Sequence, residues 1–191
     1  MGKRAFIIHG WGADSSSDWI PWLKEELERN GIAAITPNMP GTGTPTIGEW
    51  VGMLSTLITN PDPETYLVGH SIGCQAIIRY LSALPEEVMV GGIALIAPWT
   101  KVNLSNDTEI VIAKPWIETP IMWDAARHRS RKFVVVYSDN DKFVSQEDAI
   151  SFGERLGAEC ILDQNRGHFS DEDDVTQLPI LLEKLLAMAN S

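Results

Sequence analysis

Cysteine is scarce in this sequence, and a long hydrophobic run is absent. Cys74 and Cys160 are the only cysteines among 191 residues, and no CxxC spacing occurs; this argues against a disulfide framework and against a zinc knuckle. No apolar stretch reaches the roughly 18 residues of a membrane-spanning helix, and the apolar run near the N-terminus is too short for a signal peptide. We therefore expect two reduced, buried thiols in a cytoplasmic protein.

Positive charge is also in short supply. The chain has 15 Lys and Arg against 26 Asp and Glu, which gives a net charge of −11. Phosphate backbones and anionic lipid surfaces would repel such a protein at long range, so neither nucleic acid nor a membrane is an expected partner. With 44% hydrophobic residues, the chain can bury one core but is short for two, and we expect residues 1–191 to form a single domain.

Motifs for metal or phosphate binding are incomplete or missing. GTGTP (41–45) lacks the Gly-Lys-Ser/Thr ending of a P-loop, DEDD (171–174) lacks the spacing of an EF-hand, and no HExxH occurs. We interpret 41–45 as a flexible rim and DEDD as the solvated start of the final helix. The sequence therefore predicts no metal site and no cofactor.

What the sequence does contain is a regular alternation of short β-rich apolar runs with helical patterns. Strands are predicted at 5–10, 32–39, 64–70, 91–97, 133–138 and 158–163. Helices are predicted at 17–31, 46–58, 72–84, 146–156 and 175–189, with an irregular stretch at 98–132. This order is typical of an α/β protein with a mostly parallel sheet and helices on both faces. Ligands bind such sheets at the carboxyl ends of the strands.

Two predicted helices begin with recognisable capping residues. For the first, Ser17 or Asp18 is the expected N-cap, and Pro21 falls in the first turn. For the second, Thr46 and Glu49 have the spacing of a capping box.

The stretch GHSIG (69–73) places Ser71 between two glycines, where a predicted strand ends and a helix begins. On such a sharp turn the serine hydroxyl is lifted clear of the sheet, and Gly69 and Gly73 let strand and helix pass closely. The pattern favours a nucleophile over a simple N-cap. Among the backbone donors, the N–H of Ile72 lies at the start of the helix, where it could stabilise an oxyanion.

A nucleophilic serine needs a histidine base, and the sequence offers four histidines. His9 leaves the first strand, His70 sits beside Ser71 and faces away from the hydroxyl, and His128 precedes the expected acid. His168 follows the last predicted strand and completes the chain order Ser, Asp, His of this topology. We predict His168 as the base; the alternative is a loop histidine beside the acidic run.

The acid is expected after the strand at 133–138, in SDNDKFVS (138–145). Asp141 is preferred because Val144, three positions later, can pack beneath the turn, and Asp139 remains the rival. A second oxyanion donor is expected from HGWG (9–12), where Gly10 allows the backbone to turn and the N–H of Trp11 can point to the site. The alternative for HGWG is a purely structural turn.

The stretch 98–132 is long for a connection and contains several tryptophans and prolines. We interpret it as a reduced lid, or insert, in which Trp99 and Trp116 bind substrate by walling an apolar pocket for an acyl or leaving group. Plain surface packing is the alternative.

Taken in order, HGWG, PWLKEEL, NMPGTGTP, GHSIGC, SDNDKFV and RGHF resemble the small α/β-hydrolase-fold serine hydrolases of the retinoblastoma-binding protein 9 and YdeN type, over essentially the whole chain. The resemblance implies a compact α/β-hydrolase fold without a full cap domain and a triad of Ser71, Asp141 and His168. Two positions depart from the family pattern: Ser145 stands where relatives often have proline, and Asn140 where a second acidic residue is common.

We therefore expect a metal-free serine hydrolase that cleaves small carboxylic esters, or amides, through an acyl-enzyme. An aminopeptidase-like amidase is the alternative among enzymes, and an acidic residue near the pocket would favour it. The alternative of another class is a binding protein that keeps the fold without turnover. The expected partner is a small-molecule substrate, and the sequence identifies no protein partner.

Overall fold

A computed structural model describes residues 2–190. Its centre is one sheet of six strands in the order β2-β1-β3-β4-β5-β6, and every neighbouring pair is parallel. The strands are β1 (Arg4–Ile8), β2 (Ala33–Ile35), β3 (Thr65–His70), β4 (Gly92–Ile96), β5 (Phe133–Tyr137) and β6 (Glu159–Leu162). The central strands β3 and β4 are buried along their whole length, as expected for continuous apolar runs in a parallel sheet.

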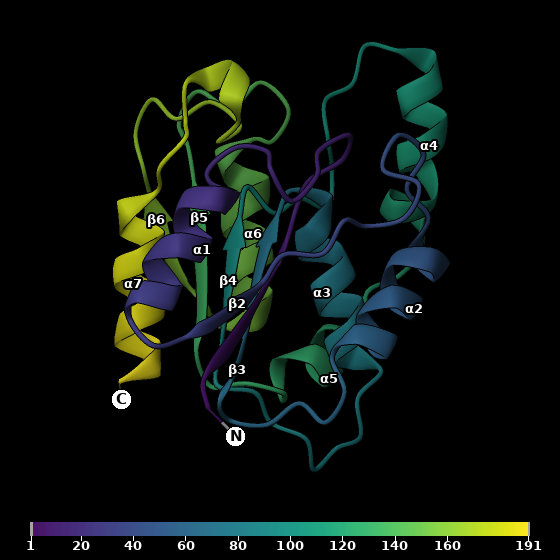
Figure 1. The fold of residues 1–191 in the computed structure, drawn as a ribbon. Helices are drawn as coiled ribbons and strands as arrows, with labels where there is room; N and C mark the ends of the chain where they lie inside the picture. The colour runs from purple at the N-terminus through teal and green to yellow at the C-terminus, as the bar shows by residue number, and fades with distance from the viewer. Residues whose placement is uncertain (1, 191) are drawn as a thin grey trace.

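Helices cover both faces of this sheet (Figure 1). One face carries α1 (Ile20–Arg29) and α7 (Pro179–Ala189). The other carries α2 (Ile47–Leu57), α3 (Ile72–Ser82), α5 (Trp123–Arg127) and α6 (Gln146–Leu156). The remaining helix, α4 (Asp107–Glu118), lies beyond the end of the sheet, and η1 (Asp171–Asp173) is a short 3₁₀ helix.

The strands supply two hydrophobic cores, one to each helical layer. In β1, for example, Phe6 and Ile8 belong to the core beneath α2 and α3, whereas Ala5 and Ile7 belong to the core beneath α1 and α7. Neighbouring side chains of a strand point to opposite faces, so both faces must be covered to remove these residues from water. The predicted parallel sheet with helices on both faces is confirmed.

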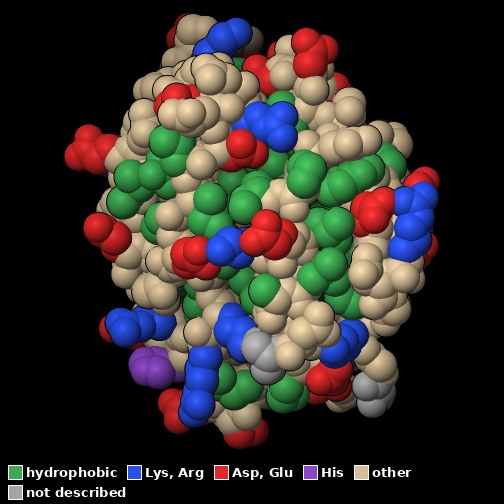
Figure 2. All heavy atoms as spheres, turned by 90° about the vertical axis from the view of Figure 1, so that its left-hand side faces the viewer, with side chains coloured by type: hydrophobic (Ala, Val, Ile, Leu, Met, Phe, Trp, Pro, Cys, Tyr) green, Lys and Arg blue, Asp and Glu red, His purple; other side chains and the backbone are tan. Residues whose placement is uncertain are grey.

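The outer surface of the α1 and α7 layer is mixed in character. Figure 2 shows hydrophobic side chains spread over this face and interrupted by acidic and basic ones. Several hydrophobic side chains that pack against the core on this face are only partly buried: Trp22, Ile161, Ile180, Leu182 and Leu186. Charged side chains divide this apolar surface into smaller areas.

The predicted start of α1 was wrong. The helix begins at Ile20, with Trp19 as an N-cap that makes no side-chain capping bond. Ser17 and Asp18 do not cap it, because the Ser17 hydroxyl accepts from the N–H of Asp14 and the Asp18 carboxylate lies beside His70. Thr46 is the N-cap of α2, and its hydroxyl accepts from the N–H of Glu49 at 3.3 Å. The Glu49 carboxylate accepts from the Thr46 hydroxyl at 2.7 Å instead of from a backbone N–H, so the expected capping box is only half formed.

Three further boundaries differ from the predictions. The second strand covers only Ala33–Ile35 instead of 32–39. The stretch 98–132 is not irregular throughout, since it contains α4 and α5. Residues 171–173 form η1, separate from the final helix, which starts at Pro179. Within residues 2–190, no helix is long and apolar enough to span a bilayer.

The chain reverses its direction of travel across the sheet between β1 and β3. After β1 it moves outward to β2, then returns to place β3 on the other side of β1. In open parallel sheets, ligands bind at the carboxyl ends of the strands beside such a switch point. The segments that leave β1 and β3 there are HGWG (9–12) and HSIG (70–73), which contain candidate site residues.

Candidate active site

Ser71 occupies a strained turn between β3 and α3. Its φ of 52° and ψ of −119° lie outside the regions that side chains favour, and its N–H is held by the carbonyl of Ile96 at 2.8 Å. The start of α3 passes the end of β1 so closely that a Cβ on Gly73 would lie 2.7 Å from the carbonyl oxygens of Ile8 and His9. Although Ser71 is at the N-cap position, its side chain makes no capping bond. The hydroxyl is free for other partners.

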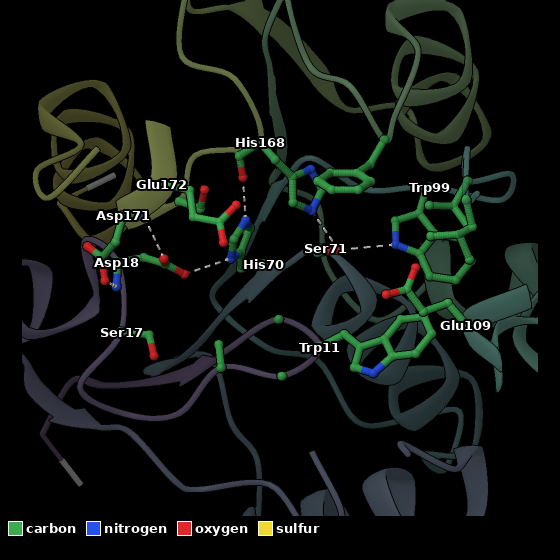
Figure 3. Close-up of a pocket in the computed structure, with 17 residues that line it drawn as sticks. Trp11, Ser17, Asp18, His70, Ser71, Trp99, Glu109, His168, Asp171 and Glu172 are labelled. Atoms are coloured by element: carbon green, nitrogen blue, oxygen red, sulfur yellow. Dashed lines mark hydrogen bonds and ion pairs between the residues drawn. The ribbon is translucent and has the colours of Figure 1, made fainter. Parts of the chain in front are cut away.

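A continuous chain of hydrogen bonds joins Ser71, His168 and Asp141. His168 Nε2 lies 3.0 Å from Ser71 Oγ, as Figure 3 shows, and His168 Nδ1 lies 2.8 Å from Asp141 Oδ2. An N–H on Nδ1 donates to the carboxylate, and Nε2 can then accept the serine proton. The other oxygen of Asp141 accepts from the N–H groups of Phe143 and Val144 at 2.8 and 3.0 Å. This geometry suits a base-activated nucleophile.

Asp139, the rival acid, has a different place. Its Oδ1 accepts from the N–H of Asn165 at 2.7 Å. Nearby, the Asn140 side-chain oxygen accepts from the N–H of Gly167 at 2.7 Å. Both side chains therefore support the loop that carries His168, whereas Asp141 contacts the imidazole itself.

A second histidine, His70, also contacts the loop that carries His168. Its Nε2 donates to the carbonyl of His168 at 2.8 Å, and its Nδ1 lies 3.4 Å from Asp18 Oδ2. Burial acts to raise the pKa of Asp18, but contacts with His70 and with the N–H of Asp171 outweigh it, and that pKa lies below its usual range. Sequence reasoning missed this pair, because nothing in the spacing of residues 18 and 70 indicates contact.

His9 is fully buried at the exit of β1 and has both ring nitrogens bonded. Nδ1 donates to the carbonyl of Gly10 at 2.7 Å, and Nε2 accepts from the N–H of Met39 at 2.9 Å. Burial lowers the pKa of His9. The ring is therefore neutral, and its two hydrogen bonds join the HGWG loop to the segment after β2.

The two expected oxyanion donors lie beside Ser71. A Cβ on Gly10 would come within 3.5 Å of Ser71 Cβ, so the HGWG loop runs directly against the serine. The Trp11 indole donates to the carbonyl of Gly43 at 3.1 Å and ties this loop to the GTGTP segment. Ile72 opens α3, where backbone N–H groups lack intrahelical acceptors. Within residues 2–190, the N–H groups of Trp11 and Ile72 have no acceptor.

A cavity of about 490 Å³ opens over Ser71. The insert contributes Trp99, Val102, Leu104 and Glu109 to its wall. The Trp99 indole N–H donates to Ser71 Oγ at 3.2 Å (Figure 3), a contact that the sequence did not indicate.

Trp116, the other expected substrate-binding residue, is not brought into this cavity. It is 1% exposed, its indole donates to the carbonyl of Pro45 at 2.9 Å, and its ring packs edge-on against Trp50. Trp116 lies on α4, and the end of this helix is held by Arg79 of α3. The Arg79 guanidinium donates to the carbonyls of Trp116 and Thr119 at 3.1 and 2.7 Å. Trp116 therefore anchors α4 instead of lining the pocket.

Acidic side chains make up much of the polar lining of the cavity. They are Asp18, Glu109, Asp171 and Glu172, and none of the described residues that line it is Lys or Arg. Asp18 and Asp171 bond reciprocally, each carboxylate accepting from the other residue's N–H at 3.0 Å. Glu109 and Glu172 form no ion pair within residues 2–190. Within the same residues, no group of three or more His, Cys, Asp or Glu is arranged to hold a metal ion.

Comparison with known proteins places this geometry in a family. The family model described as "Serine hydrolase" matches residues 5–187. YdeN of Bacillus subtilis (strain 168) is 31% identical over 185 residues, which cover 97% of this chain and 95% of YdeN. Serine hydrolase RBBP9 of Rattus norvegicus is 25% identical over 173 residues, 89% of each chain.

Solved structures agree on the fold. The crystal structure of the ydeN gene product from B. subtilis superposes with a TM-score of 0.92 at 28% identity, over 99% of this chain and 100% of that one. Est1E from Butyrivibrio proteoclasticus, solved with ferulic acid, gives a TM-score of 0.77 at 17% identity, over 99% of this chain and 90% of Est1E. With its parallel sheet, its strained serine turn and a family match over nearly its whole length, this α/β-hydrolase-fold chain belongs to the serine hydrolase family.

Proposed function

We propose that the protein hydrolyses small carboxylic esters through an acyl-enzyme formed on Ser71. The observation that carries the proposal is the unbroken contact from Asp141 through His168 to Ser71 Oγ at the floor of the cavity. A cavity of about 490 Å³ suits a small substrate. The insert at 98–132 would act as a reduced lid, since four of its residues border the cavity.

The roles of the residues follow from this arrangement. As Ser71 Oγ bonds to the ester carbon, its proton passes to His168 Nε2, and Asp141 orients the ring and stabilises the imidazolium. The N–H groups of Trp11 and Ile72 would stabilise the negative charge that develops on the carbonyl oxygen. His168 gives the proton to the departing alcohol. Water then repeats the sequence on the acyl-enzyme and releases the acid.

Labelling with a fluorophosphonate tests the nucleophile. Only a base-activated serine reacts quickly with this probe, so mass spectrometry of the labelled protein should find the adduct on Ser71. Ser71→Ala should abolish both the labelling and the hydrolysis of p-nitrophenyl butyrate. Labelling elsewhere, or full activity of the variant, would contradict the triad. A folded wild-type protein that is neither labelled nor active would support the non-catalytic binding protein instead.

A second candidate, an aminopeptidase-like amidase, is favoured by the acidic lining of the cavity. Glu109 and Glu172 have no cationic partner in the described chain, and a substrate ammonium group would supply one. An aminoacyl anilide should then be cleaved faster than its N-acetyl derivative, and Glu109→Gln should reduce that preference. Equal rates for both anilides would argue against the amidase.

Location is part of the same proposal. Cys74 and Cys160 are free thiols, and this supports a reducing compartment such as the cytoplasm. Cys74 is buried as expected, whereas Cys160 is only partly buried. Residues 2–190 form one sheet with two continuous cores, which supports a single domain for residues 1–191.

A further inference from the structure

Trp99 presents a hydrogen-bond donor to the same oxygen that His168 contacts. Its indole Nε1 lies 3.2 Å from Ser71 Oγ, on the side of the serine away from the imidazole (Figure 3). The ring is 1% exposed, so water does not compete for this donor. Trp99 therefore supplies the nucleophile with a buried hydrogen-bond donor, in addition to forming part of the apolar wall of the cavity.

The position of the indole is fixed from two other elements. The Trp99 carbonyl accepts from the side-chain amide of Gln75 on α3 at 3.0 Å. The next two N–H groups, of Thr100 and Lys101, donate to the buried carboxylate of Asp148 on α6 at 2.6 and 2.9 Å. The donor is therefore held in place before any substrate arrives, which is the condition for electrostatic preorganisation.

We propose that Trp99 is a catalytic residue whose indole N–H stabilises Ser71 Oγ as the leaving group when the acyl-enzyme is hydrolysed. The inference rests on the proposed function, because it requires an ester on Ser71. It is distinct from the oxyanion donors Trp11 and Ile72, which would act on the carbonyl oxygen of the substrate.

The chemistry of deacylation explains why the donor matters at this step. Water attacks the acyl carbon and loses a proton to His168; the bond from carbon to Oγ then breaks, and its electron pair stays on Oγ. His168 returns the proton to Oγ, and Trp99 keeps its own proton throughout. In the ester, Oγ shares its electrons with the carbonyl and accepts hydrogen bonds poorly. As the bond breaks, charge gathers on Oγ, and the hydrogen bond from Trp99 strengthens.

Acylation gains little from the same hydrogen bond. Before acylation Oγ belongs to a free hydroxyl, which already accepts well from the indole, so the bond stabilises the free enzyme about as much as the transition state. Only an interaction that is stronger in the transition state than in the preceding ground state accelerates a step. Trp99 should therefore accelerate deacylation selectively.

Trp99→Phe tests this selectivity, since it keeps an aromatic ring and removes the N–H. Stopped-flow hydrolysis of p-nitrophenyl acetate resolves the acylation burst from the steady state. We expect the deacylation rate to fall about tenfold, less than for loss of an oxyanion donor because a neutral indole at this distance is a weaker partner. The acylation rate should change by less than about threefold. We therefore expect kcat and KM to fall by the same factor, so that kcat/KM stays constant.

Two further variants separate chemistry from packing. Trp50→Phe removes an indole N–H of the same kind, bonded to the carbonyl of Pro40 at 2.8 Å in the core outside the cavity, and should leave the burst pattern unchanged. 3-Benzothienylalanine at position 99 keeps the bicyclic shape but lacks the N–H, and it should behave like Trp99→Phe even if the phenylalanine variant folds poorly.

The outcomes distinguish this inference from the proposed function. If the wild-type protein forms no acyl group on Ser71 that mass spectrometry can trap, the proposed function fails, whatever Trp99 does. If the acyl-enzyme forms and the position 99 variants slow acylation as much as deacylation, or slow neither, the role of Trp99 is overturned.

Discussion

Two buried histidines beside the site, His9 and His70, have different partners and hold different loops. His9 donates to the carbonyl of Gly10 and accepts from the N–H of Met39, an arrangement that needs a neutral ring. His70 donates to the carbonyl of His168 and turns its other nitrogen toward the Asp18 carboxylate, 3.4 Å away. The first holds the HGWG loop, and the second holds the loop of the base.

The neutral state of His9 predicts a pH dependence of stability. Burial lowers its pKa in the folded protein from the usual 6.5. Below pH 6.5, His9 therefore binds a proton in the unfolded chain but stays neutral in the folded protein. The free energy of unfolding should fall as the pH drops from 6.5 through the lower folded-state pKa. His9→Gln should be less stable at pH 7.5 but should lose less on acidification, as judged by urea denaturation at pH 7.5 and 5.5. An equally steep loss in the variant would place the effect elsewhere.

The two aspartates of the turn after β5 should differ sharply in catalysis. Asp141→Asn should lower kcat by a factor on the order of 10⁴ with little change in KM, as in related triads, because the imidazolium loses its carboxylate. Asp139→Asn should cost at most a few fold, since among residues 2–190 the Asp139 carboxylate accepts its hydrogen bond from the N–H of Asn165 and not from His168. Steady-state kinetics measures both, and circular dichroism should show both folded. A crippled Asp139→Asn enzyme would contradict the geometry.

At the level of elements, the close crossing of β1 and α3 depends on one missing Cβ. A methyl group at Gly73 would lie 2.7 Å from two backbone oxygens of the β1 exit, and backbone cannot rotate away as a side chain can. We expect Gly73→Ala to lower the free energy of unfolding by about 2 kcal/mol and to reduce kcat by displacing HGWG from Ser71. Urea denaturation and steady-state kinetics measure the two effects.

Gly52 provides the matched control for this substitution. It lies inside α2, and a Cβ there would meet nothing within 4 Å. Gly52→Ala should raise the free energy of unfolding by about 1 kcal/mol through helix propensity alone. If both alanine variants were stabilised, the crossing would be looser than described.

The sequence predicted elements well wherever local patterns determine them. The α6 bounds were predicted as 146–156 and are found there, because Ser145 caps the helix and Gly157 ends it in a left-handed conformation. The start of α1 was missed because Asp18 is engaged with His70 and Asp171, partners distant in sequence. The helix α4 was missed because its apolar residues show no strong period; Trp116 is buried, but Val111 is 69% exposed.

The same distinction holds for the site. Ser71 and His168 stand in local motifs that carry their own signal, and the structure brings them together with Asp141. Trp116 was expected in the pocket from the length, the aromatic content and the place in the chain of 98–132, and it lies in the core instead. The contacts of Trp99 with Ser71 and of Asp18 with His70 depend on tertiary placement, which no local pattern encodes.

For the whole molecule, the dominant electrostatic feature is a net charge of −11 together with a cavity whose charged lining is acidic. Such a field attracts cations, and salt screens it over about 10 Å at 0.1 M ionic strength. We expect kcat/KM for acetylcholine to fall roughly threefold to tenfold between 10 mM and 500 mM NaCl. The uncharged isostere 3,3-dimethylbutyl acetate should show almost no salt effect. Equal salt effects on both esters would exclude electrostatic attraction.

The reciprocal bond between Asp18 and Asp171 has a consequence for protein synthesis. These residues are 153 positions apart, and the bond lies next to the contact of His70 with the His168 loop. Chains emerge from the ribosome amino-terminus first at about 5–20 residues per second. Until residue 168 has been synthesised, the serine turn would thus exist without its base, and the nascent chain would be inert toward esters. Hydrolysis would begin only when the segment that carries His168 and Asp171 docks, so that activity itself would report that docking.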